Sequence, residues 1–171
     1  MRKVGELRGG WWNVVFFLIT LLVIAADQLS KTWIRSSLLV GQSQFEVGFF
    51  RLTRIHNTGA AFGLFQGQSF PLTIVASVGI VALLVYVLVV SRGFPFLGNI
   101  PNKVALGLVL GGTVGNLIDR LRFGYVTDFI DFGVWPAFNL ADSAITVGVI
   151  IFAYSLLRSI RAEKHRDGEN I

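Results

Sequence analysis

Two carboxyl side chains stand in strongly apolar surroundings in the last third of the chain. Asp128 lies in the stretch YVTDFIDF and Asp142 in the stretch FNLADSAI, on two consecutive segments. Burial in such surroundings raises the pKa of a carboxyl, and two buried carboxyls brought close together tend to hold one proton between them. Such a pair can activate water with one member and donate a proton with the other, as in aspartic proteases. The residue types therefore predict Asp128 and Asp142 as a catalytic dyad.

Two segments repeat a short pattern in which an asparagine precedes an aspartate by three residues, NLID at 116–119 and NLAD at 139–142. Residues at this spacing share a helical face, so each amide is expected beside the carboxyl of its own segment. An amide donates and accepts hydrogen bonds, and can therefore hold a carboxyl in either protonation state. The polar stripe that should face a helix bundle rather than lipid consists of Asn139, Asp142, Ser143 and Thr146.

Simpler interpretations exist for the acidic residues taken one at a time. Asp27 could end a helix at the membrane interface, and Asp119 could form a local ion pair with Arg120. Asp131 could be solvated in a loop, and Asp142 could be a first-turn acid favoured by the helix dipole. These interpretations leave unexplained why two carboxyls occupy apolar surroundings on consecutive segments.

The elements that must position these residues are membrane helices. Of the 171 residues, 53% are hydrophobic and 15% are charged, against about 25% charged in soluble domains. A hydrocarbon core about 30 Å thick needs about 20 helical residues to cross it. The first apolar segment could also be a signal peptide, but Ile24 occupies a position that cleavage after Ala26 would require to be small. We predict one integral membrane domain with spans at about 11–27, 70–91, 103–119 and 138–158.

Three glycines at a spacing of four lie on one face of the third span. Gly107, Gly111 and Gly115 lack side chains on that face, so a neighbouring helix can approach closely there. This pattern favours a compact bundle of the four helices.

The distribution of basic residues predicts the orientation in the membrane. Of the fifteen Lys and Arg residues, nine lie in the N-terminal segment, the 91–103 connection and the C-terminal tail. Basic residues near span ends favour the cytoplasmic side, so both termini are expected inside. This topology places every acidic residue outside the two tails at or beyond the outer helix ends. These residues are Asp27, Glu46, Asp119, Asp128, Asp131 and Asp142.

Other chemistries find little support in the composition. The chain has no Cys and only His56 and His165, far apart, so neither a metal site nor a cofactor is expected. His56 has no G-x-S-x-G motif nearby, and the H-E-x-x-H and G-x-G-D signatures are absent. The net charge of +5 fits cytoplasmic ends and contacts with anionic lipids, so nucleic-acid binding is not expected.

Four blocks occur in the order and spacing of a known family: DQLSK (27–31), NTGAAFG (57–63), GGTVGNLIDRLRFGYVTDFIDF (111–132) and FNLADSAI (138–145). Over about 160 residues the chain resembles the lipoprotein signal peptidases, or type II signal peptidases, of bacteria. The resemblance implies an aspartic endopeptidase of the bacterial inner membrane that removes the signal peptide of prolipoproteins. The cut falls just before a lipobox Cys that bears diacylglycerol. Small departures are Ser30, where Thr is frequent, and Gly63, where Ser is frequent.

The same resemblance assigns the site residues. The catalytic aspartates of the family correspond to Asp128 and Asp142. Residues expected to bind the peptide backbone or support the dyad are Asp27, Lys31, Asn57, Asn116, Asp119, Arg120 and Asn139. Partners would be prolipoproteins carrying diacylglyceryl-Cys and membrane lipids, with the enzyme as a monomer.

The family fold is a four-transmembrane-helix bundle with a small extracytoplasmic β-rich cradle and a surface helix, and the active site near the outer leaflet. The 41–69 region could supply the cradle and the surface helix, because its FEVGFFRLTRI stretch suits strands.

Two other classes of function remain open from the residues alone. A proton-coupled transporter or channel component would also carry intramembrane acids, but it needs them distributed across the membrane. The middle and inner parts of all four predicted spans lack such residues. A non-catalytic assembly subunit would gain support if Asp128 and Asp142 lay too far apart to share a proton.

Overall fold

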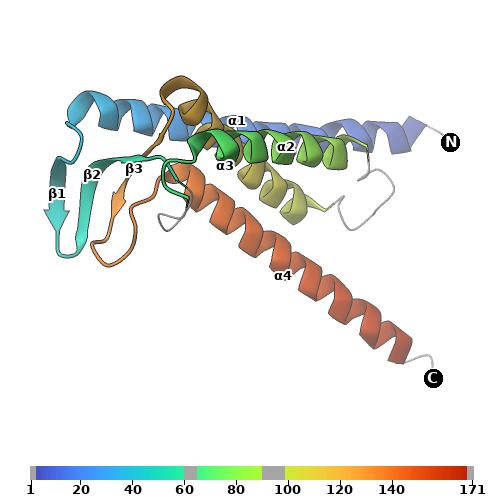
Figure 1. Ribbon diagram of the computed structural model, residues 1–171. Coiled ribbons are helices and arrows are strands. Elements are labelled where there is room, and N and C mark those ends of the chain that lie inside the picture. Colours follow the sequence, from blue (N-terminus) through green and yellow to red (C-terminus); the bar gives the residue numbers. More distant parts are fainter. Residues whose placement is uncertain (1–2, 60–64, 90–98, 169–171) are drawn as a thin grey trace.

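The computed structural model describes residues 3–59, 65–89 and 99–168. In these ranges the elements follow one another as α1 (Lys3–Ser37), β1 (Ser43–Val47), β2 (Phe50–Asn57), α2 (Ser69–Leu88), α3 (Ile100–Phe123), β3 (Val126–Asp131) and α4 (Leu140–Gly168). The strands gather at one end of the molecule, and the ends marked N and C lie at the other end (Figure 1). The helices and the sheet thus occupy separate regions.

Each of the four described helices contains a segment long and apolar enough to cross a membrane. These segments are Asn13–Ser37, Ser69–Leu88, Ile100–Phe123 and Leu140–Ala162. Their outer surfaces expose large apolar side chains such as Val75, Val78 and Ile150, as lipid contact requires. With the small sheet, they confirm the predicted class of an all-α membrane protein with a β-rich cradle.

The first helix is longer than the sequence suggested. The predicted span ended at residue 27, whereas α1 continues to Ser37. Asp27, Lys31 and Ile34 are fully buried at helical spacing on one face of this continuation. Hydropathy alone ended the segment too early, because it counts buried, paired charges as polar. Asp27 therefore lies within the helix, and its interpretation as a helix-end residue at the interface was wrong.

Glycine contacts explain how closely α3 packs against its neighbours. A Cβ atom at Gly107 would lie 2.9 Å from the Phe16 carbonyl oxygen, and one at Gly111 would lie 2.7 Å from Val23 Cβ. The predicted glycine face thus packs against α1. A second face, which the spacing did not indicate, packs against α4, where a Cβ at Gly112 would clash with the Ala141 carbonyl oxygen. Close packing on both faces makes α3 the centre of the bundle.

The sheet is antiparallel, in the order β1-β2-β3. The 41–69 region supplies β1 and β2, as the resemblance implied, but the third strand comes from 126–131, in the connection between the third and fourth predicted spans. Gly124, at φ 77°, ends α3 and turns the chain into β3. Residues 41–59 and 65–68 contain no helix, and 60–64, where the expected surface helix could otherwise fall, lie outside the described residues.

Candidate active site

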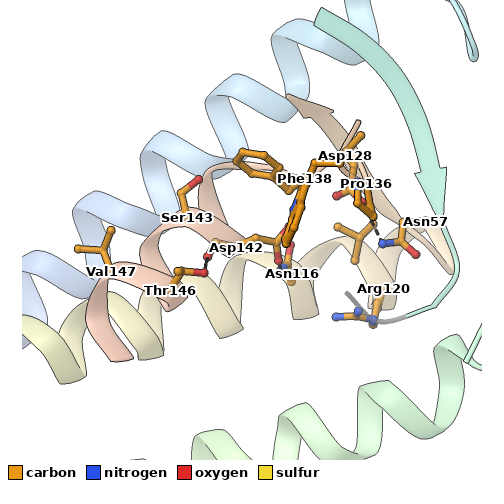
Figure 2. A pocket seen from close by; sticks show the side chains of 13 residues that line it. Asn57, Asn116, Arg120, Asp128, Pro136, Phe138, Asp142, Ser143, Thr146 and Val147 are labelled. Carbon is orange, nitrogen blue, oxygen red and sulfur yellow. Dashed lines mark hydrogen bonds between the residues drawn. The ribbon is translucent and has the colours of Figure 1, made fainter. Parts of the chain in front are cut away.

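A pocket of about 520 Å³ opens where the sheet meets α3 and α4. Its polar side chains come from β2, α3, β3 and α4, and they converge on one space (Figure 2). They include Asn57, Asn116, Arg120, Asp128 and Asp142. Apolar side chains from 135–138 complete the wall. The pocket can therefore present carboxyl, amide and guanidinium groups to one ligand.

Strand alternation turns Asp128 toward the pocket. Val126 and Asp128 line it, while Phe129 packs on the other face against Ile34 of α1 and Leu38, which directly follows this helix. Asp128 is only 2% exposed. Its Oδ1 accepts a hydrogen bond from Asn139 Nδ2 at 2.8 Å, and its Oδ2 accepts one from Asn57 Nδ2 at 2.9 Å.

The environment of Asp128 favours its neutral form. Burial is the largest cause and the negative charge of Asp142 the next, and together they raise the pKa of Asp128 to about 7. The two amide donors and the more distant Lys31 oppose the rise, because they stabilise the charged form. Near neutral pH the Asp128 carboxyl can consequently hold or release a proton.

Asp142 is held by the start of α4. Asp142 N–H donates to Asn139 Oδ1 at 3.0 Å, and Asn139 N–H donates back to Asp142 Oδ2 at 3.2 Å. This reciprocal arrangement is a capping box, in which Asn139 precedes the helix and Asp142 lies in its first turn. Asn139 and Asp142 are neighbours as expected, but through capping rather than through a shared helical face.

Asn116 crosses from α3 to α4 and binds Asp142. Its Nδ2 donates to Asp142 Oδ1 at 2.8 Å, and its Oδ1 accepts from Lys31 Nζ at 2.8 Å. Asn139 Nδ2 donates to the same oxygen at 3.1 Å. Because an ammonium group only donates, these two donors fix which end of the Asn116 amide faces Asp142. The expected pairing of Asn116 with Asp119 in the same helix was therefore wrong.

A buried group of charges lies directly behind the amides. Lys31 Nζ lies 2.9 Å from Asp27 Oδ2 and 3.8 Å from Asp119 Oδ2, with all three side chains fully buried. Arg35 NH1 pairs with Asp119 Oδ1 at 3.2 Å, and Gln28 Nε2 donates to Asp27 Oδ2 at 3.2 Å and Asp119 Oδ1 at 3.3 Å. Buried charges are tolerated only when they are paired and hydrogen-bonded in this way.

Sequence reasoning missed Gln28 and Arg35. A signal for Arg35 exists in the stretch DQLSKTWIR, where Asp27, Lys31 and Arg35 recur every four residues and so share one helical face. Nothing comparable distinguishes Gln28.

Two further interpretations are revised by the contacts of Arg120 and Asp131. Arg120 NH2 donates to the Gly59 carbonyl oxygen at 3.1 Å and lines the pocket, while Asp119 is engaged by Arg35 instead. Asp131 is buried rather than solvated, and its Oδ2 accepts from Arg51 Nε at 2.7 Å. Burial opposes ionisation of Asp131, but its bonds from Gly133 N–H and Arg51 outweigh it and hold its pKa below the ordinary value.

Of the seven supporting residues named from the resemblance, six are joined by hydrogen bonds or ion pairs to the groups around Asp128 and Asp142, and Arg120 lines the same pocket. Within the described ranges, no group of three or more His, Cys, Asp or Glu side chains is arranged to hold a metal ion.

Comparison with known proteins defines the class first. Two solved structures, both described as bacterial membrane enzymes, superpose on this chain. The first superposes with a TM-score of 0.75 and 32% sequence identity, and the aligned part covers 85% of this chain and 88% of the chain of that structure. The second superposes with a TM-score of 0.72 and 33% sequence identity, and the aligned part covers 83% of this chain and 92% of the chain of that structure. The fold is therefore the one found in these bacterial membrane enzymes.

Sequence comparison then gives the family. The family model described as signal peptidase (SPase) II matches residues 19–158. A protein named lipoprotein signal peptidase from Dehalococcoides mccartyi is 53% identical over 138 residues, which are 81% of this chain and 86% of that protein. Another of that name from Moorella thermoacetica is 46% identical, over 83% of this chain and 92% of that protein. The chain belongs to the signal peptidase II family, and it is accordingly a peptidase.

Proposed function

We propose that this protein removes the signal peptide from prolipoproteins by cutting just before a Cys that bears diacylglycerol, with Asp128 and Asp142 as an aspartic dyad. The observation that carries the proposal is that the two carboxyls line one pocket and are joined through the Asn116 and Asn139 amides. Membership of the signal peptidase II family supports the substrate class.

The proposed chemistry uses one proton shared by the pair. Burial and the charge of Asp142 raise the pKa of Asp128 to about 7, which supports Asp128 as the proton donor and Asp142 as the base in the proposed mechanism. Water loses a proton to Asp142 as its oxygen attacks the scissile carbonyl carbon, and Asp128 protonates the carbonyl oxygen. The tetrahedral intermediate returns that proton to Asp128 while Asp142 protonates the leaving nitrogen, and the C–N bond breaks. Both carboxyls regain their starting states, so no other reactant than water is consumed.

Position in the membrane favours a substrate that brings its own anchor. The distribution of basic residues favours a cytoplasmic position for both termini. The strands β2 and β3, which carry Asn57 and Asp128 of the pocket, lie at the opposite end of the molecule from the termini (Figure 1). The site would then lie near the outer leaflet of the inner membrane, beside helix surfaces that contact lipid. A diacylglyceryl group held in that leaflet would confine the scissile bond near the dyad, which reduces the entropic cost of encounter. One protomer supplies the whole pocket, so we propose a monomer.

The alternative of a proton-coupled transporter finds no support. Residues 104–118 and 143–157 of the two helices that carry the pocket contain no Asp, Glu, Lys, Arg or His. A relay across the membrane would need such groups at intervals.

The proposal is tested with purified protein in detergent and a prolipoprotein prepared with and without diacylglycerol on its lipobox Cys. The lipid-modified form should be cut before that Cys, as determined by mass spectrometry of both products, and the unmodified form should be cut far more slowly. Equal cleavage of both forms, or a cut elsewhere, would contradict the proposed substrate.

A further inference from the structure

The two aspartates of the proposed dyad are each preceded by a residue whose backbone is held by a buried carboxylate. Ala141 N–H, next to Asp142, donates to Asp27 Oδ1 at 3.1 Å. Thr127 N–H, next to Asp128, donates to Asp119 Oδ2 at 2.9 Å. The main chain of α4 and that of β3 are thus both attached to side chains of the helix bundle at the point where the reacting groups project.

One side chain connects these two attachments. Lys31 Nζ lies 2.9 Å from Asp27 and 3.8 Å from Asp119, and it also donates to Asn116 Oδ1 at 2.8 Å. The Asn116 amide in turn donates to Asp142. Lys31 is fully buried, so water cannot take over these bonds when the ammonium group is removed.

The charges of this group balance. Asp27 and Asp119 contribute two negative charges, and Lys31 and Arg35 contribute two positive ones. Arg35 contacts Asp119 and the Thr127 hydroxyl, on the side of β3. Asp27 has Lys31 as its ion-pair partner, so loss of Lys31 leaves a buried carboxylate without a cation.

We propose that Lys31 is a positioning residue for both members of the dyad: through Asp27 it holds the start of α4, through Asp119 the start of β3, and through Asn116 the Asp142 carboxylate. The inference rests on the proposed function. It states that Lys31 determines how the Asp128 and Asp142 carboxyls lie relative to each other. Lys31 contacts neither the Asp128 nor the Asp142 carboxyl directly.

A charge in this place should also affect the pH dependence of the reaction. The charged groups near Asp128 are Lys31 from α1, Asp119 and Arg120 from α3, and Asp142 from α4. His56 of the neighbouring strand pairs with Thr127, so its side chain lies on the other face of the sheet. Burial, and next the positive charge of Arg54, lower the pKa of His56, so it is neutral near pH 7. Lys31 opposes the raised pKa of Asp128. Its removal should move the alkaline arm of the pH–rate profile to higher pH.

The experiment compares Lys31→Met with Lys103→Met, the matched removal of a second buried lysine from the start of α3. Lys103 lies thirteen residues before Asn116 in this helix, or about 20 Å along its axis. For Lys31→Met we expect kcat to fall by about 100-fold, as for a misplacement of about 1 Å, with little change in KM and the alkaline arm displaced upward. Lys103→Met should leave kcat, KM and the profile as in the unaltered protein.

A second variant protects the test against misfolding. Asp27→Asn/Lys31→Met removes one charge of each sign, so the buried group stays neutral, and the oxygen of the introduced amide can still accept from Ala141 N–H. The kcat of this double variant should remain low, because the Asn116 oxygen has lost the shorter of its two donor bonds, the one from Lys31 at 2.8 Å, and keeps the bond from Asn139 Nδ2 at 3.1 Å.

Two results would overturn the inference. One is a folded Lys31 variant with unaltered kcat and pH profile, and the other is a lowered kcat with an unmoved alkaline arm. Neither would affect the proposed function, which fails instead if Asp128→Asn or Asp142→Asn remains active.

Discussion

Replacement of Asp128 by Asn should make the protein more stable at alkaline pH. In the folded state the pKa of Asp128 is about 7, against an ordinary value of 3.8, because burial and then Asp142 disfavour its charge. Between these two values the folded protein holds a proton that the unfolded chain has released. Stability therefore falls as pH rises through this window and stays low above pH 7.

The size of the effect follows from the difference in pKa. At about 1.36 kcal/mol per pKa unit, the raised pKa of Asp128 lowers the free energy of unfolding by about 4 kcal/mol at pH 8 and by about 2 kcal/mol at pH 5. Asn stays neutral but cannot accept from both Asn57 and Asn139, since its amide carries only one oxygen, and the lost bond costs about 1 kcal/mol. The net gain should be about 3 kcal/mol at pH 8 and about 1 kcal/mol at pH 5.

Unfolding of the two proteins in mixed micelles at pH 5 and pH 8 measures this gain. Asp131→Asn is the matched control, because Asp131 lies on the same strand but has a lowered pKa and an Arg51 partner. The ionised Asp131 stabilises the fold at pH values above its ordinary pKa of 3.8. The Asp131→Asn variant should therefore be less stable than the unaltered protein at both pH 5 and pH 8. If Asp128→Asn were no more stable than the unaltered protein at pH 8, Asp128 would not be a desolvated acid, and the proton assignment would be wrong.

Three further predictions concern packing and the surroundings of the dyad. Gly112→Ala should lower the free energy of unfolding by about 1–3 kcal/mol, since its Cβ would clash with the Ala141 carbonyl oxygen. Gly79→Ala is the control and should leave this free energy unchanged, because a Cβ at Gly79 meets no atom within 4 Å. Unfolding of both variants in mixed micelles measures the difference. Asn57→Ala removes a bond to the Asp128 carboxylate, so kcat should fall about tenfold, and the alkaline arm of the pH–rate profile should move upward. Arg51→Gln should cost less than about 1 kcal/mol, because the Arg51 side chain is 45% exposed; a larger loss would show that the pair holds the sheet.

Hydropathy identified the four membrane helices, because lipid-facing surfaces require long apolar runs. It failed at the end of α1, where Lys31 and Arg35 are polar in sequence but lie against α3 in the structure. It also missed β3, since a six-residue strand buried on both faces has no alternation to distinguish it from a loop between spans.

The candidate site shows the same division between local and tertiary information. Asp128 and Asp142 could be selected from their apolar neighbours in the sequence alone. The partners of the amides could not, because spacing within one segment says nothing about contacts between segments. Asn116 binds across to Asp142, and Asn139 caps α4 while donating to Asp128.

The most direct test of the dyad is the rate at which Asp128→Asn and Asp142→Asn cleave a lipid-modified prolipoprotein, with Asp131→Asn as the control. General acid–base groups typically contribute about 10²–10⁴-fold each. Both variants should therefore lose at least about 100-fold in kcat while remaining folded, and the control should retain its activity. Cleavage by either variant at close to the unaltered rate would contradict the assignment of Asp128 and Asp142 as the catalytic pair.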